Sequence, residues 1–347
     1  MLVTGRAKRG SIPESEAEPA SADIAIDLLA ALCKAGGDSL RLQILQLLRQ
    51  DSLAVQEMCT ILDTRQPALS HHLKVMAAAG LVTRRREGNT IFYRRAVPDG
   101  ATPQGRLQAA LLAAVDSAGT GAELVQRLGS LRGEREQSSR RFFRENADKF
   151  REQQDLIASY EQYADTVAET LAASLPESRR QALEVGPGEG AFLSVLSPQF
   201  DKVIALDNAE EMLDKSRQLA AGESLDNITF VHGDTRHRDL ASLAADCIVV
   251  NMVLHHTPSP ADVFRDLGNC LAPGGVLLVT DLCRHDQDWA REACGDLWLG
   301  FEPEELTAWA SAAGLVETAG VYLAQRNGFQ IQVRLFGHQT IQQGQLL

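Results

Sequence analysis

The sequence predicts two folded domains, a small α+β unit near the N-terminus and a larger doubly wound α/β unit in the C-terminal half. Three observations lead to this prediction. Residues 21–97 combine short amphipathic helices with a basic hairpin, residues 181–338 alternate β-branched strands with helices, and a strongly charged helical stretch lies between them. A chain of 347 residues, 44% of them hydrophobic, can bury more than one core.

Charge is distributed unevenly along the chain. The net charge of -12 argues against a protein covered by nucleic acid over its whole surface, but residues 21–97 contain ten Lys or Arg against seven Asp or Glu. The six cysteines form no Cys-x-x-Cys pair and no Cys-His spacing typical of zinc sites, which predicts reduced thiols in a cytoplasmic protein and no metal site. No segment reaches the length of a membrane span, so no membrane partner is expected.

Four short helices are expected in the N-terminal unit. The stretches 23–36 and 38–50 place apolar residues at helical spacing, with Asp38 as a candidate N-cap residue. A third helix is expected near 54–62, and a fourth begins at Gln66. Two short helices joined by a tight turn predict a helix-turn-helix.

The fourth helix and the hairpin after it carry the candidate DNA contacts. One face of the helix is apolar and the other is polar, and the polar face is expected to enter a major groove. Residues 82–95 alternate around Gly88-Asn89 as a basic hairpin would. Arginines there are expected to bind phosphates, and the helix residues to read base edges, although any one of these side chains alone also fits a solvated surface. The predicted DNA-binding residues are Gln66, Ser70, His71, Lys74, Arg84, Arg85, Arg86 and Arg94.

The run "QPALSHHLK", followed by "AGLV", resembles the recognition helix of the ArsR family of winged-helix regulators. The resemblance covers about seventy-five residues, the size of one small domain. It implies a homodimer on double-stranded operator DNA, and "GRLQAALLAAVDSA" resembles the terminal dimer helix of that family. Metal-sensing members carry a Cys-x-Cys pair where this chain has Ala54 and Gln56, so metal sensing through that site is not expected.

The C-terminal unit alternates short apolar strands with helical segments, which predicts a Rossmann-like sheet. In such sheets, ligands bind at the carboxyl ends of the strands. The expected strands are 182–186, 202–207, 228–234, 245–252 and 275–282, followed by a hairpin of 315–323 and 328–338.

Glycines and acids stand at these strand ends. The first strand runs into "LEVGPGEG", whose glycines permit a tight turn and a close approach of ligand to backbone. Asp207 ends the second strand, at the position where an acid accepts hydrogen bonds from ribose hydroxyls. The glycines alone also fit a dinucleotide dehydrogenase, whose ordinary signature lacks the later acid, Asp234. Asp207 and Asp234 also fit as caps of the turns that follow them.

Together with "NMVLHH" after the fourth strand, Glu184, Asp207 and Asp234 resemble the class I methyltransferase family. The resemblance implies S-adenosylmethionine, or its product S-adenosylhomocysteine, as cofactor. It assigns Glu184 to the methionine end, Asp207 to the ribose and Asp234 to the adenine amino group. The predicted cofactor-binding residues are Glu184, Gly186, Gly188, Gly190, Asp207, Asn208, Asp234, Thr235 and Asn251.

His255 and His256, after the fourth strand, are the candidate catalytic residues, because either could accept a proton from a hydroxyl or amine acceptor. Each fits equally well as a residue that holds the loop. In the charged stretch before the first strand, Phe142, Phe143 and Phe150 interrupt a pattern typical of a solvated helix, and we expect them to pack on the next domain. The resemblance to methyltransferases implies that this helix covers the cofactor.

These features predict a DNA-binding transcriptional regulator of ArsR type whose methyltransferase domain senses or uses S-adenosylmethionine. The alternative is a methyltransferase for a small molecule, such as arsenite or a metabolite, in which the winged helix serves mainly dimerisation. The expected organisation is a disordered tail (1–20), a winged helix-turn-helix domain (21–97), dimerisation and connecting helices (98–175), a class I methyltransferase domain (176–338) and a tail (339–347).

Overall fold

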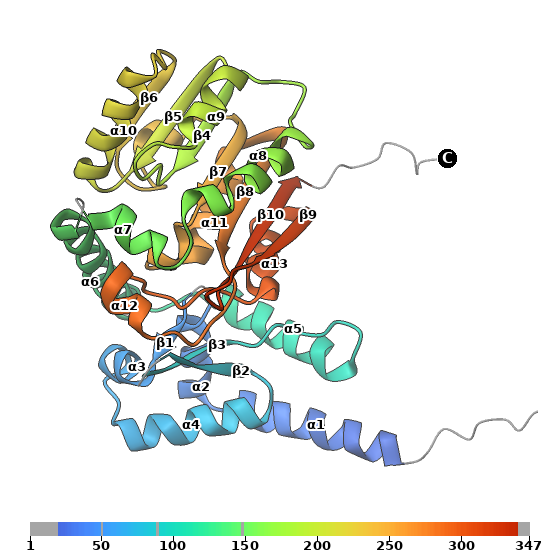
Figure 1. Ribbon diagram of the computed structural model, residues 1–347. Coiled ribbons are helices and arrows are strands. Elements are labelled where there is room, and N and C mark those ends of the chain that lie inside the picture. Colours follow the sequence, from blue (N-terminus) through green and yellow to red (C-terminus); the bar gives the residue numbers. More distant parts are fainter. Residues whose placement is uncertain (1–19, 50, 88–89, 147–148, 339–347) are drawn as a thin grey trace, which may run out of the picture.

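The computed structural model describes residues 20–49, 51–87, 90–146 and 149–338 (Figure 1). The expected tails, apart from Ala20, and the expected hairpin turn at Gly88-Asn89 lie outside the described residues. Within these ranges, no helix has the length and apolar character needed to cross a membrane.

The N-terminal unit contains the predicted helices and hairpin. Leu69, Leu73 and Met76 of the fourth helix are fully buried, so the helix presents its polar face outward. Asp38 caps the second helix, since its Oδ1 accepts a hydrogen bond of 3.0 Å from the backbone N–H of Arg41. The elements are α1 (Ala20–Gly36), α2 (Ser39–Leu47), β1 (Leu53–Ala54), α3 (Val55–Leu62), α4 (Gln66–Ala78), β2 (Val82–Glu87) and β3 (Thr90–Arg95), with sheet order β1-β3-β2.

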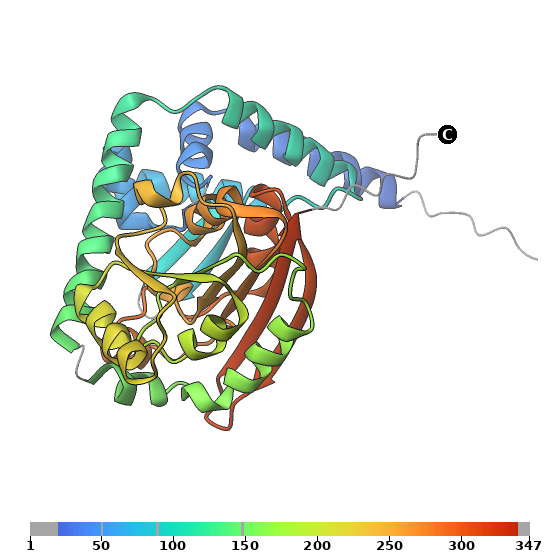
Figure 2. The same ribbon diagram turned by 90° about the horizontal axis from the view of Figure 1, so that it is seen from above.

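Connecting helices join the two units. Figure 2 shows α1 and α5 (Pro103–Ser117) extending together from one edge of the molecule. The charged stretch forms one long helix, α6 (Ala122–Asn146). This helix contacts both units and is not surrounded by solvent. It is followed by α7 (Phe150–Asp155), a 3₁₀ turn (Tyr160–Gln162) and α8 (Ala164–Ala172).

A seven-stranded sheet of order β6-β5-β4-β7-β8-β10-β9 forms the C-terminal unit. β10 is antiparallel to both neighbours and the other pairings among β4 to β8 are parallel, as the predicted sheet with a closing hairpin requires. The strands are β4 (Gln181–Val185), β5 (Lys202–Asp207), β6 (Ile228–His232), β7 (Ala245–Asn251), β8 (Leu271–Leu282), β9 (Leu315–Ala324) and β10 (Gln330–His338). The strand order reverses between β4 and β7, which is where doubly wound sheets bind their ligands.

Helices cover both faces of this sheet. One core contains α8 and the short α9 (Leu193–Leu196), and the other contains α11 (Pro260–Cys270) and α13 (Pro303–Ala312). The remaining helices are α10 (Glu210–Gly222) and α12 (Trp289–Cys294). In Figure 1 the N-terminal unit lies beside the α12–α13 end of the sheet, with α4 on its far side.

Candidate cofactor site and nucleic-acid interface

A cavity of about 300 Å³ lies at the carboxyl ends of β4, β5 and β7. The structure brings eight of the nine predicted cofactor residues to its wall, together with His256. Gly190 and His255 do not line it. The eight are Glu184, Gly186, Gly188, Asp207, Asn208, Asp234, Thr235 and Asn251.

The turn after β4 requires glycine at two positions for different reasons. Gly186 has a φ of 66°, and a Cβ there would meet the Val253 side chain at 2.5 Å. Gly190 has a φ of 90°, and a Cβ there would meet the backbone of Ser216 in α10 at 3.0 Å. Gly186 therefore opens the cavity beside β7, whereas Gly190 allows α10 to pack closely against the turn.

Two carboxyl groups lie at the strand ends, Glu184 buried and Asp207 half-buried. Burial, with a smaller contribution from the charge of Asp207, raises the pKa of Glu184 to about 8. Burial also raises the pKa of Asp207 to about 6, although its Oδ1 accepts a hydrogen bond from the backbone N–H of Ala209. Glu184 Oε2 and both side-chain polar atoms of Asn251 have no hydrogen-bond partner. A ligand with a cationic group and hydroxyl groups would satisfy these carboxyl and amide groups, so the site fits a nucleoside cofactor that carries an amino-acid side arm.

The third acid is partly engaged by a neighbour. Asp234 accepts hydrogen bonds from the backbone and the guanidinium of Arg236, which also lies 3.4 Å from Glu136 of α6. Burial opposes ionisation, but these hydrogen bonds prevail and hold the pKa of Asp234 below its ordinary value. Asp207 and Asp234 thus cap turns, as the alternative interpretation expects, and also line the cavity.

The side of the cavity formed by α6 was not predicted from the sequence. Arg132, Glu136, Ser139 and Phe143 of α6 all line it, and their spacing of four, three and four residues places them on one helical face. Only Phe143 stood out in the sequence, because the other three are polar. Tyr160, Tyr163 and Gln154 complete this side.

The two candidate catalytic histidines have different environments. His255 is fully buried, its Nδ1 lies 2.8 Å from Asp281 Oδ1, and it does not border the cavity, so its expected role as a base that contacts the acceptor is wrong. His256 borders the cavity and packs edge-on against Phe143. Burial and the neighbouring His255 keep the pKa of His256 well below its ordinary value, so its ring is neutral.

Residues 150–331, slightly more than half of the chain, match a family model described as a methyltransferase domain. The chain belongs to the methyltransferase-domain family. Residues 38–84 match the model of the bacterial regulatory protein, arsR family, so the methyltransferase domain follows an ArsR-type helix-turn-helix. Membership of this family supports the cofactor expected from the sequence, the methyl donor S-adenosylmethionine.

The curated relatives are similar to less than half of this chain. A malonyl-[acyl-carrier protein] O-methyltransferase of Marinomonas sp. is 29% identical over 153 residues, which cover 42% of this chain and 54% of the relative. An arsenite methyltransferase of Halobacterium salinarum is 29% identical over 113 residues, covering 32% of this chain and 29% of the relative. The chain therefore spans about half or less of the length of these relatives. N-methyltransferase NodS from Bradyrhizobium japonicum, solved with S-adenosyl-L-homocysteine, is similar at 19% identity and a TM-score of 0.41, covering 51% of this chain and 85% of that chain.

The candidate recognition helix is open to solvent. Gln66, Ser70, His71 and Lys74 are all exposed, and they lie on the face of α4 opposite its buried leucines. Figure 1 shows α4 on the side of the winged helix that is away from the methyltransferase sheet. This face is accessible to a DNA duplex.

The hairpin requires a correction to the predicted DNA contacts. Arg85 and Arg94 pair with Glu305 of α13, and Arg85 is largely buried, so these two arginines bind the methyltransferase domain instead of facing DNA. The physical reason is strand alternation, since Arg85 pairs with Phe92 in the hairpin and both side chains point to the same face. Phe92 packs edge-on against Trp298, with a centroid separation of 5.4 Å. Arg84 and Arg86 lie on the other face and are exposed.

Arginines of α6 tie the winged helix to the cavity. Arg132, in the cavity wall, donates hydrogen bonds to both oxygens of Asp51 and lies 2.9 Å from Asp262 of α11. One turn on, Arg135 binds Glu57 of α3, with Nη2 to Oε1 at 2.7 Å, and its guanidinium lies 5.1 Å from the Trp298 ring centroid. The helix α6 therefore contacts the helix-turn-helix unit, Trp298 of the methyltransferase domain and the cofactor cavity.

Proposed function

We propose that this chain is a DNA-binding transcriptional regulator whose methyltransferase domain binds S-adenosylmethionine and S-adenosylhomocysteine, and whose operator affinity depends on which of them is bound. The observation that carries the proposal is the position of α6. Its residues line the cofactor cavity and also bind Asp51 and Glu57 of the winged helix. A change of α6 position on ligand binding would therefore reach the helix-turn-helix directly.

Three acidic residues would each bind a different part of the cofactor. Glu184 would bind its ammonium group indirectly or directly, Asp207 would accept hydrogen bonds from its ribose, and Asp234 would meet the adenine amino group once Arg236 yields. When bound, S-adenosylmethionine supplies an electrophilic methyl group on a sulfonium, and the cavity excludes water around it. Phe143 and Ser139 of α6 would cover it.

The two ligands differ by one methyl group and one positive charge, which gives a physical reason for different effects. A ligand shifts DNA affinity only by its differential affinity for two conformations, typically about 1 to 3 kcal/mol, or roughly five- to 150-fold. The cavity near α6 and α11 is lined by charged side chains, the acids Glu136, Asp262 and Asp266 and the arginines Arg132 and Arg236. The cationic sulfonium and the neutral thioether would therefore act differently on the arginine contacts of α6.

Homodimerisation is part of the proposal, because half-sites in an operator are read by two recognition helices. Ile26 and Leu28 of α1 are 64% and 42% exposed. The adjacent α5 exposes a stripe of small side chains, Ala109, Ala110, Ala113 and Ala114. The exposed Ile26 of α1 and the alanine stripe of α5 support a dimer formed through these two helices.

The cofactor assignment is tested by calorimetry on wild-type protein and on Asp207→Ala. Loss of hydrogen bonds to an ionised group should weaken S-adenosylmethionine and S-adenosylhomocysteine about 10- to 150-fold. Asp201→Ala, which changes an exposed acid immediately before the same strand, is the control. Unchanged affinity in Asp207→Ala, or preferential binding of NADH by wild type, would refute the assignment.

The regulatory assignment is tested on an operator selected from random duplexes. Fluorescence anisotropy at fixed salt should give different affinities for the apo protein and for the protein saturated with each ligand. Equal affinities in all three states, with ligand binding demonstrated, would leave the alternative of a small-molecule methyltransferase ahead. His256 at the cavity wall and the match to an arsenite methyltransferase favour keeping that alternative in view.

A further inference from the structure

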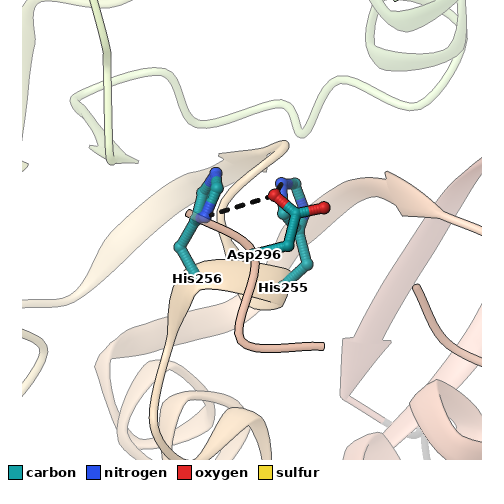
Figure 3. Close-up of side chains that lie close together, drawn as sticks. All are labelled: His255, His256 and Asp296. Carbon is teal, nitrogen blue, oxygen red and sulfur yellow. Dashed lines mark ion pairs between the residues drawn. The ribbon is translucent and has the colours of Figure 1, made fainter. Parts of the chain in front are cut away.

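A cluster of metal-binding side chains lies behind the cofactor cavity. His255 and His256 come from the turn Leu254–His256 after β7, and Asp296 comes from the loop after α12. Figure 3 shows the Asp296 carboxylate beside the two imidazole rings. One ligand atom from each residue lies within 4.8 Å of the others, and all three side chains are at least nine-tenths buried.

Three polar atoms of this cluster have no hydrogen-bond partner, whereas His256 Nδ1 lies 3.3 Å from the carbonyl oxygen of Gly295. Neither oxygen of Asp296 has a hydrogen-bond partner, and His255 Nε2 has none. Asp296 Oδ1 lies 3.9 Å from His255 Nε2 and 3.7 Å from His256 Nδ1. These separations are too long for hydrogen bonds but close to the distance of about 3.4 Å between two ligands of one tetrahedral zinc ion. The charges of His255 and Arg291 act favourably on Asp296, but neither of its oxygens accepts a hydrogen bond, and a bound cation would satisfy both of them.

The surroundings of His255 are those of a metal ligand. Asp281 Oδ1 accepts the Nδ1–H of His255 at 2.8 Å, and Asp281 Oδ2 accepts a hydrogen bond from the backbone of Leu254. This contact fixes the tautomer with a free lone pair on Nε2, the atom that faces Asp296. A carboxylate that orients a ligating imidazole in this way is the usual outer partner of protein zinc sites.

The loops on both sides are held in register. The backbone N–H groups of Leu297 and Trp298 donate to the carbonyl of His255, at 2.9 and 3.1 Å, and the indole N–H of Trp298 donates to Thr257. These hydrogen bonds hold the two loops that carry the three side chains against each other.

We infer that His255 Nε2, His256 Nδ1 and an Asp296 oxygen bind a divalent transition-metal ion of the zinc class. Two imidazoles and one carboxylate leave one coordination position for water or for an acceptor atom. Because His256 borders the cavity, the ion would join the cavity wall to the loop after α12, which packs against the winged-helix interface through Trp298. This inference departs from the sequence analysis, which predicts no metal site.

A competing explanation needs no metal. In it, His256 Nδ1 donates to the carbonyl of Gly295 at 3.3 Å, and a protonated His255 lies between Asp281 and Asp296. Burial lowers the pKa of His255, but the two carboxylates outweigh it and raise the value to about 9. This arrangement leaves both Asp296 oxygens without hydrogen bonds, which the metal explains and the protonated imidazole does not.

The test measures metal stoichiometry in the full chain. Protein stripped with chelator is dialysed against Zn²⁺ or Co²⁺, and the bound metal is quantified. We expect one equivalent per chain, a Co²⁺ ligand-field spectrum without a thiolate charge-transfer band, and a higher melting temperature with Zn²⁺. Absence of the thiolate band separates this site from binding to exposed Cys33. Binding of less than one tenth of an equivalent would overturn the inference.

Two variants locate the ion. Asp296→Asn is close to isosteric and should fold, and it should lower metal affinity at least 100-fold, as should His256→Ala. Asp286→Asn changes an exposed acid near the same loops and should retain full stoichiometry. Retention of the wild-type affinity in a folded Asp296→Asn protein, or equal loss in Asp286→Asn, would place the ion elsewhere and overturn the inference.

Discussion

At the scale of single residues, Glu184 near the end of β4 is a buried carboxyl group with a raised pKa. Glu184 is 2% exposed, its Oε2 has no hydrogen-bond partner, and its pKa is raised to about 8. In the apo protein it is therefore mostly protonated at neutral pH. A ligand that brings an ammonium group would favour the ionised form and release a proton.

The raised pKa of Glu184 predicts the pH dependence of stability. The group is neutral in both states below its unfolded pKa of about 4.5, and its ionisation is penalised only in the folded state as pH rises toward 8. The free energy of unfolding of the apo protein should therefore fall with pH across this window, by up to about 1.4 kcal/mol per pH unit from this residue.

Glu184→Gln should remove that contribution. Urea denaturation of apo wild-type and variant protein at several pH values measures it, and Glu177→Gln, an exposed acid, is the matched control. Parallel pH profiles for wild type and Glu184→Gln would contradict the raised pKa.

At the scale of elements, one face of the β2–β3 hairpin is exposed to solvent and the other contacts the methyltransferase domain. Arg84 is exposed, whereas Arg85 pairs with Glu305 of α13. Burial lowers the pKa of Arg85 to about 10, partly offset by Glu305, so the side chain stays charged at neutral pH. The exposed face is available to phosphates, and the covered face holds the domains together.

Alanine at these two neighbouring positions should therefore give different results. Arg84→Ala should weaken binding to all DNA sequences and reduce the slope of log affinity against log salt by about one. Arg85→Ala should leave that slope unchanged and instead lower the stability of the domain interface, seen as earlier cleavage between the domains by protease. A salt slope that falls with Arg85→Ala and not with Arg84→Ala would reverse the assignment.

The sequence predicted elements better than it predicted contacts. The β-branched runs and helical spacings located the strands from β4 to β10 and the helices α2 to α4, since periodicity depends on burial of one face. The prediction for Arg85 was wrong. The alternation of the hairpin shows that its two faces differ, but it does not show that α13 covers the face that carries Arg85. The sequence also predicted contacts only for the phenylalanines of α6 and a solvated position for its charged residues, because its arginines bind partners, Asp51 and Glu57, more than seventy residues away.

Candidate site residues followed the same division. Glu184, Asp207 and Asp234 were found because strand ends in a doubly wound sheet converge at one place. Asp296 was not found, since nothing in its local sequence separates it from a surface acid and only the tertiary fold brings it to His255 and His256. Polar residues of α6 were missed for a similar reason.

At the scale of the whole molecule, the proposed dimer is tested through α1. Ile26→Asp places a charge on the exposed face of α1 and should convert the dimer to a monomer and weaken operator binding, because two half-sites are no longer joined. Sedimentation velocity measures the change, and Val97→Asp, which alters an equally exposed apolar residue outside this face, is the control. A monomeric wild-type protein would contradict the proposed dimer.

The central claim is that the cofactor cavity and the operator-binding face are energetically coupled through α6. Coupling of this kind is reciprocal, so the factor by which S-adenosylhomocysteine changes operator affinity must equal the factor by which operator DNA changes S-adenosylhomocysteine affinity. The most direct measurement is calorimetric titration of the wild-type protein with S-adenosylhomocysteine, with and without saturating operator. The account predicts a change of roughly five- to 150-fold that matches the anisotropy result and disappears in Arg135→Ala. The same ligand affinity with and without operator would contradict it.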